Sequence, residues 1–169
     1  MADVRCGLIG YGAWGQHHAR AIRAAQGTAL VAICARSVES QARARADCPD
    51  ARIYADHRAM LAREDLHLVD VVLPSDLHFP VARDVLEAGC NLLLEKPMAL
   101  SVEHCSQLVR LAESRGKTLA IGHELRLGAR EQRLRCPSTL KKLWTTPIIC
   151  DWTSVHPSIV LIVPFREID

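Results

Sequence analysis

VRCGLIGYGAWG, residues 4–15, joins a short apolar run to three closely spaced glycines. In a dinucleotide-binding turn, the first glycine permits a tight bend, the second lets the backbone approach a pyrophosphate, and the third brings helix and strand together. The spacing predicts a strand over residues 4–9 and a helix beginning near residue 14, whose free amides would face phosphate. A glycine turn without a ligand is the alternative interpretation. The residues predicted to contact a dinucleotide are Gly10, Tyr11, Gly12, Ala13, Trp14 and Gly15.

Apolar runs and helix signals then alternate as far as about residue 123. Runs suited to buried strands occur at residues 29–34, 68–73, 91–94 and 118–121. Ser37, Asp56 and Ser101 are each placed to cap a helix, and Gly89 and Gly116 to end one. The alternation predicts an α/β protein with a doubly wound parallel sheet (Rossmann fold) and helices on both faces. The last helix is expected to bury Cys105, Leu108, Val109 and Ala112.

The loops that follow these strands carry the chemically interesting residues. Ligands of a doubly wound sheet bind at the carboxyl ends of the strands, so these loops should line one crevice. A lysine in that position, Lys96, can reach a ligand lying across the sheet, while its neighbours Glu95 and Pro97 restrict where it points. The loop residues predicted to contact a cofactor are Arg36, Ser37, Pro74, Ser75, Glu95, Lys96 and Pro97.

Arg36 bears on which cofactor would bind. An NAD site usually has an acidic residue about 20 residues beyond the glycines, which holds the ribose hydroxyls. Here that neighbourhood holds Ala35, Arg36 and Ser37. A guanidinium and a hydroxyl suit a 2′-phosphate, so NADP is favoured and NAD is the alternative. A solvated surface arginine is the other interpretation of Arg36.

Composition limits the classes of function. A net charge of +2 gives no argument for nucleic-acid binding. No apolar run approaches the ~20 residues of a membrane span, and the start lacks the pattern of a signal peptide. The seven cysteines show no C-x-x-C spacing, so we expect reduced thiols, no metal site and a cytoplasmic protein. The adjacent His17 and His18 lack the i, i+4 spacing of a helical zinc pair, and we expect them to be packing or surface residues and not metal ligands.

Four motifs in this order resemble one known family. They are residues 10–15, Pro74-Ser75-Asp76-Leu77-His78, Glu95-Lys96-Pro97 and Gly122-His123-Glu124-Leu125-Arg126. The combination is similar to the glucose-fructose oxidoreductase, inositol dehydrogenase and rhizopine catabolism (Gfo/Idh/MocA) family. The resemblance covers about the first three quarters of the chain. It implies a nicotinamide cofactor and a sugar, inositol or related polyol substrate.

The resemblance also implies roles for two side chains. Lys96 would lie near the nicotinamide and the reacting carbon, and His78 would flank the same pocket, so both are predicted to be catalytic. Lys96 as an ammonium could hydrogen-bond the substrate oxygen and stabilise developing alkoxide charge during hydride transfer. The alternatives are a lysine paired with Glu95 for structural reasons and a histidine that makes a capping contact near Asp76.

The last part of the chain does not resemble the family. We predict an NAD(P)-binding domain over residues 1–128 and an irregular extension over residues 129–169 in place of the family's second domain. The two alternatives for this extension are one irregular strand-bearing segment and a tail produced by truncation or a shifted reading frame. Residues 159–163 look like a strand closed by Pro164. The predicted function is an NAD(P)-dependent oxidoreductase acting on a sugar or polyol; the alternative is a nucleotide-binding module without turnover. We also expect this chain to form homo-oligomers.

Overall fold

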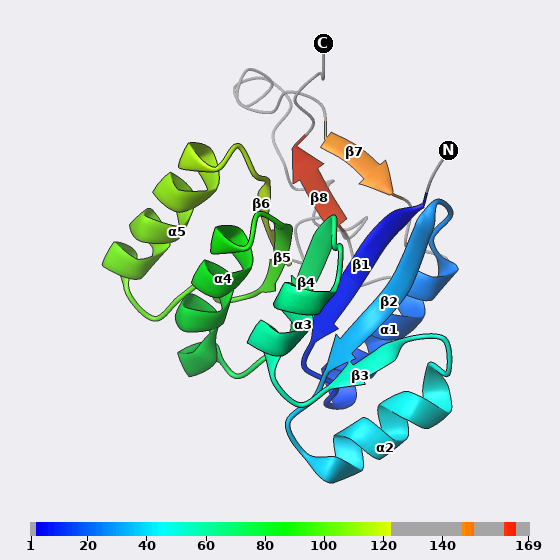
Figure 1. Ribbon diagram of the computed structural model, residues 1–169. Coiled ribbons are helices and arrows are strands. Elements are labelled where there is room, and N and C mark those ends of the chain that lie inside the picture. Colours follow the sequence, from blue (N-terminus) through cyan, green and yellow to red (C-terminus); the bar gives the residue numbers. More distant parts are fainter. Residues whose placement is uncertain (1–2, 123–146, 151–160, 165–169) are drawn as a thin grey trace, which may run out of the picture.

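A six-stranded parallel sheet forms the centre of the molecule (Figure 1). The computed structural model describes residues 3–122, 147–150 and 161–164. The strand order is β3-β2-β1-β4-β5-β6, with every neighbouring pair parallel, which confirms the predicted doubly wound sheet. The strands are β1 (Val4–Ile9), β2 (Thr28–Cys34), β3 (Arg52–Tyr54), β4 (Leu68–Val71), β5 (Asn91–Glu95) and β6 (Leu119–Gly122). The helices are α1 (Ala13–Ala24), α2 (Val38–Asp47), α3 (His57–Arg63), the 3-10 turn η1 (Ser75–Leu77), α4 (His78–Glu87) and α5 (Val102–Ser114).

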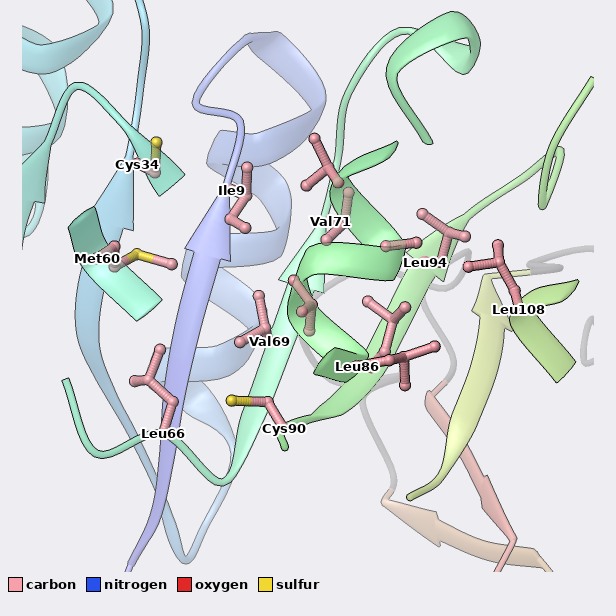
Figure 2. Close-up of a cluster of buried hydrophobic side chains, with 14 of the residues drawn as sticks. Ile9, Cys34, Met60, Leu66, Val69, Val71, Leu86, Cys90, Leu94 and Leu108 are labelled. Atoms are coloured by element: carbon pink, nitrogen blue, oxygen red, sulfur yellow. The ribbon is translucent and has the colours of Figure 1, made fainter. Parts of the chain in front are cut away.

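Two apolar clusters cover the two faces of the sheet. Successive strand residues point to opposite faces, so Leu8 packs with α1 and α2 while Ile9 packs with α3 and α4. Figure 2 shows the second cluster, in which Val71 and Leu94 of the central strands lie against Leu86 of α4. Full burial of each such side chain contributes about 1.5–3 kcal/mol. The clusters also contain four free, buried cysteines: Cys6 and Cys48 in the first, and Cys34 and Cys90 in the second.

The helices are short and begin where the sequence predicts. The side chains of Ser37, Asp56 and Ser101 accept hydrogen bonds from backbone amides at the starts of α2, α3 and α5. Gly89, after α4, has a φ of 81°, as expected of a left-handed helix end. Within the described ranges, no helix is long and apolar enough to cross a lipid bilayer.

Three details differ from the sequence-based expectations. The edge strand β3 was not predicted, because three residues are too short to show a period. Strand β4 ends at Val71 instead of residue 73, since the chain turns toward Pro74 and η1 there. Val109 of α5 is 41% exposed, so only Leu108 and Ala112 of the four expected residues are buried.

A second, two-stranded sheet is formed late in the chain. Strand β7 (Pro147–Cys150) pairs antiparallel with β8 (Leu161–Pro164). The strand expected over residues 159–163 is thus present in part, with Pro164 as its last residue. The remainder of the predicted extension, and the motif residues after Gly122, lie outside the described residues. The boundary at residue 128 stays a prediction.

Candidate functional site

A cavity of about 450 Å³ opens at the carboxyl edge of the sheet. It lies at the point where strand order reverses, since β1 pairs with β2 on one side and with β4 on the other. Open α/β sheets bind ligands at this point. The cavity brings together the glycine turn, the end of β4 and the end of β5, three segments far apart in the sequence. Its lining residues are Gly12, Ala13, Trp14, Gly15, Val72, Leu73, Glu95 and Lys96.

The three glycines of the turn serve two different purposes. Gly10 has a φ of 104°, and a Cβ atom there would lie 2.0 Å from the backbone oxygen of Val72. A Cβ atom on Gly15 would lie 2.1 Å from the backbone oxygen of Gly10. A Cβ atom on Gly12, in contrast, would meet no atom within 4 Å. Gly10 is therefore required by the close approach of the segment after β4, and Gly15 by the close approach of α1 to the end of β1, whereas Gly12 leaves open space on the cavity side.

The first turn of α1 is left open by its N-cap. Gly12 occupies that position and makes no side-chain capping hydrogen bond, unlike Ser37, Asp56 and Ser101 at the starts of α2, α3 and α5. The amides at a helix N-terminus carry partial positive charge and point along the helix axis. This end of α1 lines the cavity, so the arrangement suits an anionic ligand.

Tyr11 points away from the cavity. Its side chain is buried, and its hydroxyl donates to Asp47 Oδ2 at 3.0 Å and lies 3.6 Å from Cys48 Sγ. Burial, followed by the contacts with Cys48 and Asp47, raises the pKa of this hydroxyl. The side chain of Tyr11 is therefore not available to a dinucleotide, so the predicted contact would have to involve the Tyr11 backbone.

Lys96 follows β5 directly and is exposed at the cavity wall. Its backbone amide donates to Glu95 Oε2 at 3.1 Å, and its peptide bond to Pro97 is cis. The indole Nε1–H of Trp14 donates to Glu95 Oε1 at 3.2 Å. One carboxylate therefore contacts both the backbone of Lys96 and the first turn of α1.

A buried charge cluster behind the cavity was not predicted. His18 Nδ1 lies 2.7 Å from Asp70 Oδ2, and His18 Nε2 lies 3.2 Å from Glu95 Oε1, an ion-pair distance at which the geometry falls short of a hydrogen bond. The sequence feature that could have indicated this cluster is Asp70 inside the apolar run 68–73, because a buried carboxylate needs a partner. Among the described residues, no group of three His, Cys, Asp or Glu side chains is arranged to hold a metal ion.

The pKa values of His18 and Glu95 are both shifted within this cluster. Burial by itself lowers the pKa of His18, but Asp70 and then Glu95 outweigh burial and raise that pKa to about 10. Burial raises the pKa of Glu95, while the His18 imidazolium, the Trp14 indole and the Lys96 amide together hold it below its usual value. His18 is thus a cation on α1 that contacts one carboxylate from β4 and one from β5.

His78 is fully buried and does not line the cavity. Its Nδ1 lies 2.6 Å from the backbone oxygen of Pro97, and its Nε2 lies 2.8 Å from that of Leu73. Both ring nitrogens therefore contact backbone oxygens. The His78 ring therefore links Pro97, in the turn after Lys96, to Leu73, in the loop after β4.

The remaining predicted residues lie in loops beside the cavity. Arg36 is exposed two residues after the end of β2, the neighbour of β1. The Ser37 oxygen accepts the Ser40 amide at 3.1 Å as the cap of α2, and its hydroxyl hydrogen remains available for donation. Pro74 and Ser75 follow β4 at the start of η1. The sheet places all four at the same edge as the glycine turn, although they do not line the cavity itself.

Comparisons with known proteins agree with this geometry. The chain is 34% identical over 135 residues to the UDP-N-acetylglucosamine 3-dehydrogenase of Acidithiobacillus ferrooxidans, covering 80% of this chain and 42% of that protein. Among solved structures, it is similar to the WlbA dehydrogenase of Chromobacterium violaceum in complex with NADH and UDP-GlcNAcA (29% identity, TM-score 0.75, 79% of this chain and 39% of that one). It is also similar to biliverdin reductase of Synechocystis sp. PCC 6803 in complex with biliverdin and NADP+ (29% identity, TM-score 0.73, 78% and 42%).

The chain spans about two fifths of the length of these relatives. Residues 4–123 match the oxidoreductase family with an NAD-binding Rossmann fold that is called Gfo/Idh/MocA. With its glycine turn, doubly wound sheet and Glu95-Lys96-Pro97 segment, the chain belongs to this family of oxidoreductases.

Proposed function

We propose that the chain binds NADP and presents it to a sugar, inositol or related polyol for hydride transfer. The observation that carries the proposal is the cavity that joins the glycine turn to Lys96. A dinucleotide needs both a phosphate site and a site for its nicotinamide. The similar structures with NADH and with NADP+ support a nicotinamide dinucleotide, and the relative named for UDP-N-acetylglucosamine supports a sugar-like substrate.

Each part of the cofactor has a matching group on the chain. The pyrophosphate would lie at the open space of Gly12, against the first amides of α1. The 2′-phosphate would meet the exposed guanidinium of Arg36 and the hydroxyl hydrogen of Ser37. The nicotinamide half would extend past Pro74 and Ser75 toward Lys96. The absence of an acidic residue at positions 35–37 favours NADP over NAD.

Lys96 is the proposed catalytic residue. Its ammonium would donate a hydrogen bond to the reacting oxygen of the substrate and stabilise the negative charge that develops there. The bound nicotinamide supplies the hydride chemistry. For His78 we propose a positioning role in place of direct catalysis, because its ring is buried and occupied by the backbone oxygens of Pro97 and Leu73.

Binding of NADPH should change the fluorescence of Trp14. The indole is 39% exposed and lines the cavity, so a nicotinamide nearby should quench its emission or accept its excitation energy. The measurement is a fluorescence titration, with calorimetry as the independent assay. Trp14→Phe is the control, because it should lose most of the optical response while calorimetry still detects binding. An unchanged calorimetric signal at millimolar NADPH would refute the proposed function.

Arg36→Ala should weaken NADPH much more than NADH. Loss of a charge-assisted contact costs about 1.5–3 kcal/mol, which corresponds to roughly a tenfold to hundredfold rise in Kd for NADPH. The matched control is Arg43→Ala, which removes an exposed arginine of the neighbouring helix α2 that pairs with Glu39. It should leave both affinities unchanged. Equal losses for NADPH and NADH in Arg36→Ala would show that the guanidinium does not read the 2′-phosphate.

A further inference from the structure

His18 joins the helix of the glycine turn to two strands of the sheet. It lies on α1, while its partners Asp70 and Glu95 lie on the neighbouring strands β4 and β5. The distances are 2.7 Å to Asp70 Oδ2 and 3.2 Å to Glu95 Oε1. All three side chains are buried. One imidazole ring therefore fixes where α1 lies across β4 and β5.

Stability alone is a poor reason for this cluster. Removing ions from water costs several kcal/mol each, and apolar residues of similar volume often fill such a site with no loss of stability. The cluster also leaves Asp70 Oδ1 without a hydrogen-bond partner among the described residues. An arrangement this costly is better explained by the groups that it holds in place.

The group that it holds is the carboxylate of Glu95. Oε1 also accepts the Trp14 indole N–H at 3.2 Å, and Oε2 accepts the Lys96 amide at 3.1 Å. On a third side lies Gly122 of β6, where a Cβ atom would be 3.0 Å from Glu95 Oε1. The carboxylate is thus confined, and it contacts both walls of the cavity: the first turn of α1 and the backbone of Lys96.

We propose that His18 is a positioning residue which, through Glu95, fixes the spacing between the glycine turn and Lys96 so that one dinucleotide reaches both. This inference rests on the proposed function, because it requires phosphate on the turn and nicotinamide near Lys96. A ligand that must meet two sites at once gains from both only when they are held at its own length. His18 does not line the cavity, so it acts through Glu95 and not by touching the cofactor.

The test compares a whole cofactor with half of one. Adenosine 2′,5′-bisphosphate (2′,5′-ADP) has the adenosine and the 2′-phosphate but no nicotinamide, so it does not need to reach Lys96. In His18→Gln, calorimetry should show NADPH binding weakened by about tenfold or more, whereas 2′,5′-ADP changes by less than about threefold. The matched control is His57→Gln, which removes a histidine of α3 that pairs with Asp84 at 2.8 Å. It should change neither affinity.

Other outcomes are equally informative. Equal losses of both ligands in His18→Gln, or no loss of either, would overturn the positioning role. Failure of the unmodified chain to bind either ligand would overturn the proposed function, and this inference with it. Asp70→Asn is the second variant if His18→Gln does not fold, because the asparagine oxygen can still accept the His18 Nδ1–H while the charge behind the ring is removed. The same split between NADPH and 2′,5′-ADP is expected.

A spectroscopic measurement needs no ligand. In the unliganded chain, the nuclear magnetic resonance signals of the Trp14 indole N–H and the Lys96 amide should both shift in His18→Gln or Asp70→Asn, because both groups donate to Glu95. Neither signal should shift in His57→Gln. If both signals stay in place in the His18 and Asp70 variants, the proposed link through Glu95 does not exist.

Discussion

Gly10→Ala should destabilise the protein by about 3–5 kcal/mol, a large part of the ~5–15 kcal/mol that holds a domain folded. The new Cβ atom would lie 2.0 Å from the backbone oxygen of Val72, and no side-chain rotation relieves a clash with backbone. The φ of 104° at Gly10 adds strain for any residue with a Cβ atom. Urea unfolding followed by circular dichroism would measure the loss as a lower midpoint.

Two other glycines separate the causes of this loss. Gly27 has a φ of 75° but open space, so Gly27→Ala should cost only about 1–2 kcal/mol from the backbone conformation. Gly12 has open space and an ordinary φ of −74°, so Gly12→Ala should cost about 1 kcal/mol or less, from the poorer N-cap that alanine makes. Gly12→Ala should nevertheless weaken NADPH, because its methyl group stands on the cavity side. Equal stability of the Gly10 and Gly12 variants would contradict the assignment of roles in the turn.

Stability should fall as the pH rises from about 6.5 to about 10, because over this range the folded chain keeps a proton on His18 that the unfolded chain has released. The pKa of His18 is 6.5 as an ordinary value and about 10 in the folded chain. A pKa that is raised by folding contributes stability in full below the unfolded value, and this contribution disappears as the pH passes the folded value. Relative to a neutral His18 ring in the same place, the shift corresponds to a contribution on the order of 3–5 kcal/mol at pH 6. Urea unfolding at a series of pH values would measure it.

The titratable groups near His18 determine whether the fall in stability over this pH range can be assigned to it. Burial together with Asp70 raises the pKa of Cys6 on β1 to about 12, so the Cys6 thiol keeps its proton across this range. His18→Gln should therefore be less stable at pH 6 and lose much less stability up to pH 10. Parallel curves for the two proteins would show that His18 is not the titrating group. On the acid side the sign reverses, because the lowered pKa of Glu95 means that its stabilisation is lost as the pH falls through that value.

Much of the fold is predictable because its causes are local. Ser37, Asp56 and Ser101 cap helices through amides two or three residues away, and Gly89 ends one through its own backbone freedom. The spacing of the three glycines likewise identifies the turn from adjacent residues, although the close contact of Gly10 is with the distant Val72. These features, together with the alternation of apolar runs, are sufficient to predict the doubly wound sheet and the edge at which the cavity opens.

The side-chain partners are not predictable in the same way. His18, Asp70 and Glu95 meet only because α1 crosses two particular strands, and no local pattern states which strands these are. Tyr11 and His78 lie in motifs that suggest ligand contact, yet packing turns both side chains into the interior. A motif therefore locates a backbone segment at the site, but the direction of each side chain depends on neighbours distant in the sequence.

The placement of the free cysteines makes the two faces of the sheet chemically distinguishable. A thiol reacts as its thiolate, and burial raises the pKa of Cys6 to about 12 and that of Cys34 to about 11. Cys6 belongs to the cluster under α1 and α2, and Cys34 to the cluster under α3 and α4. A thiol reagent should therefore modify each of them mainly when its own side of the sheet opens. The rates of alkylation at the two positions would show which layer of helices detaches first and at what free energy.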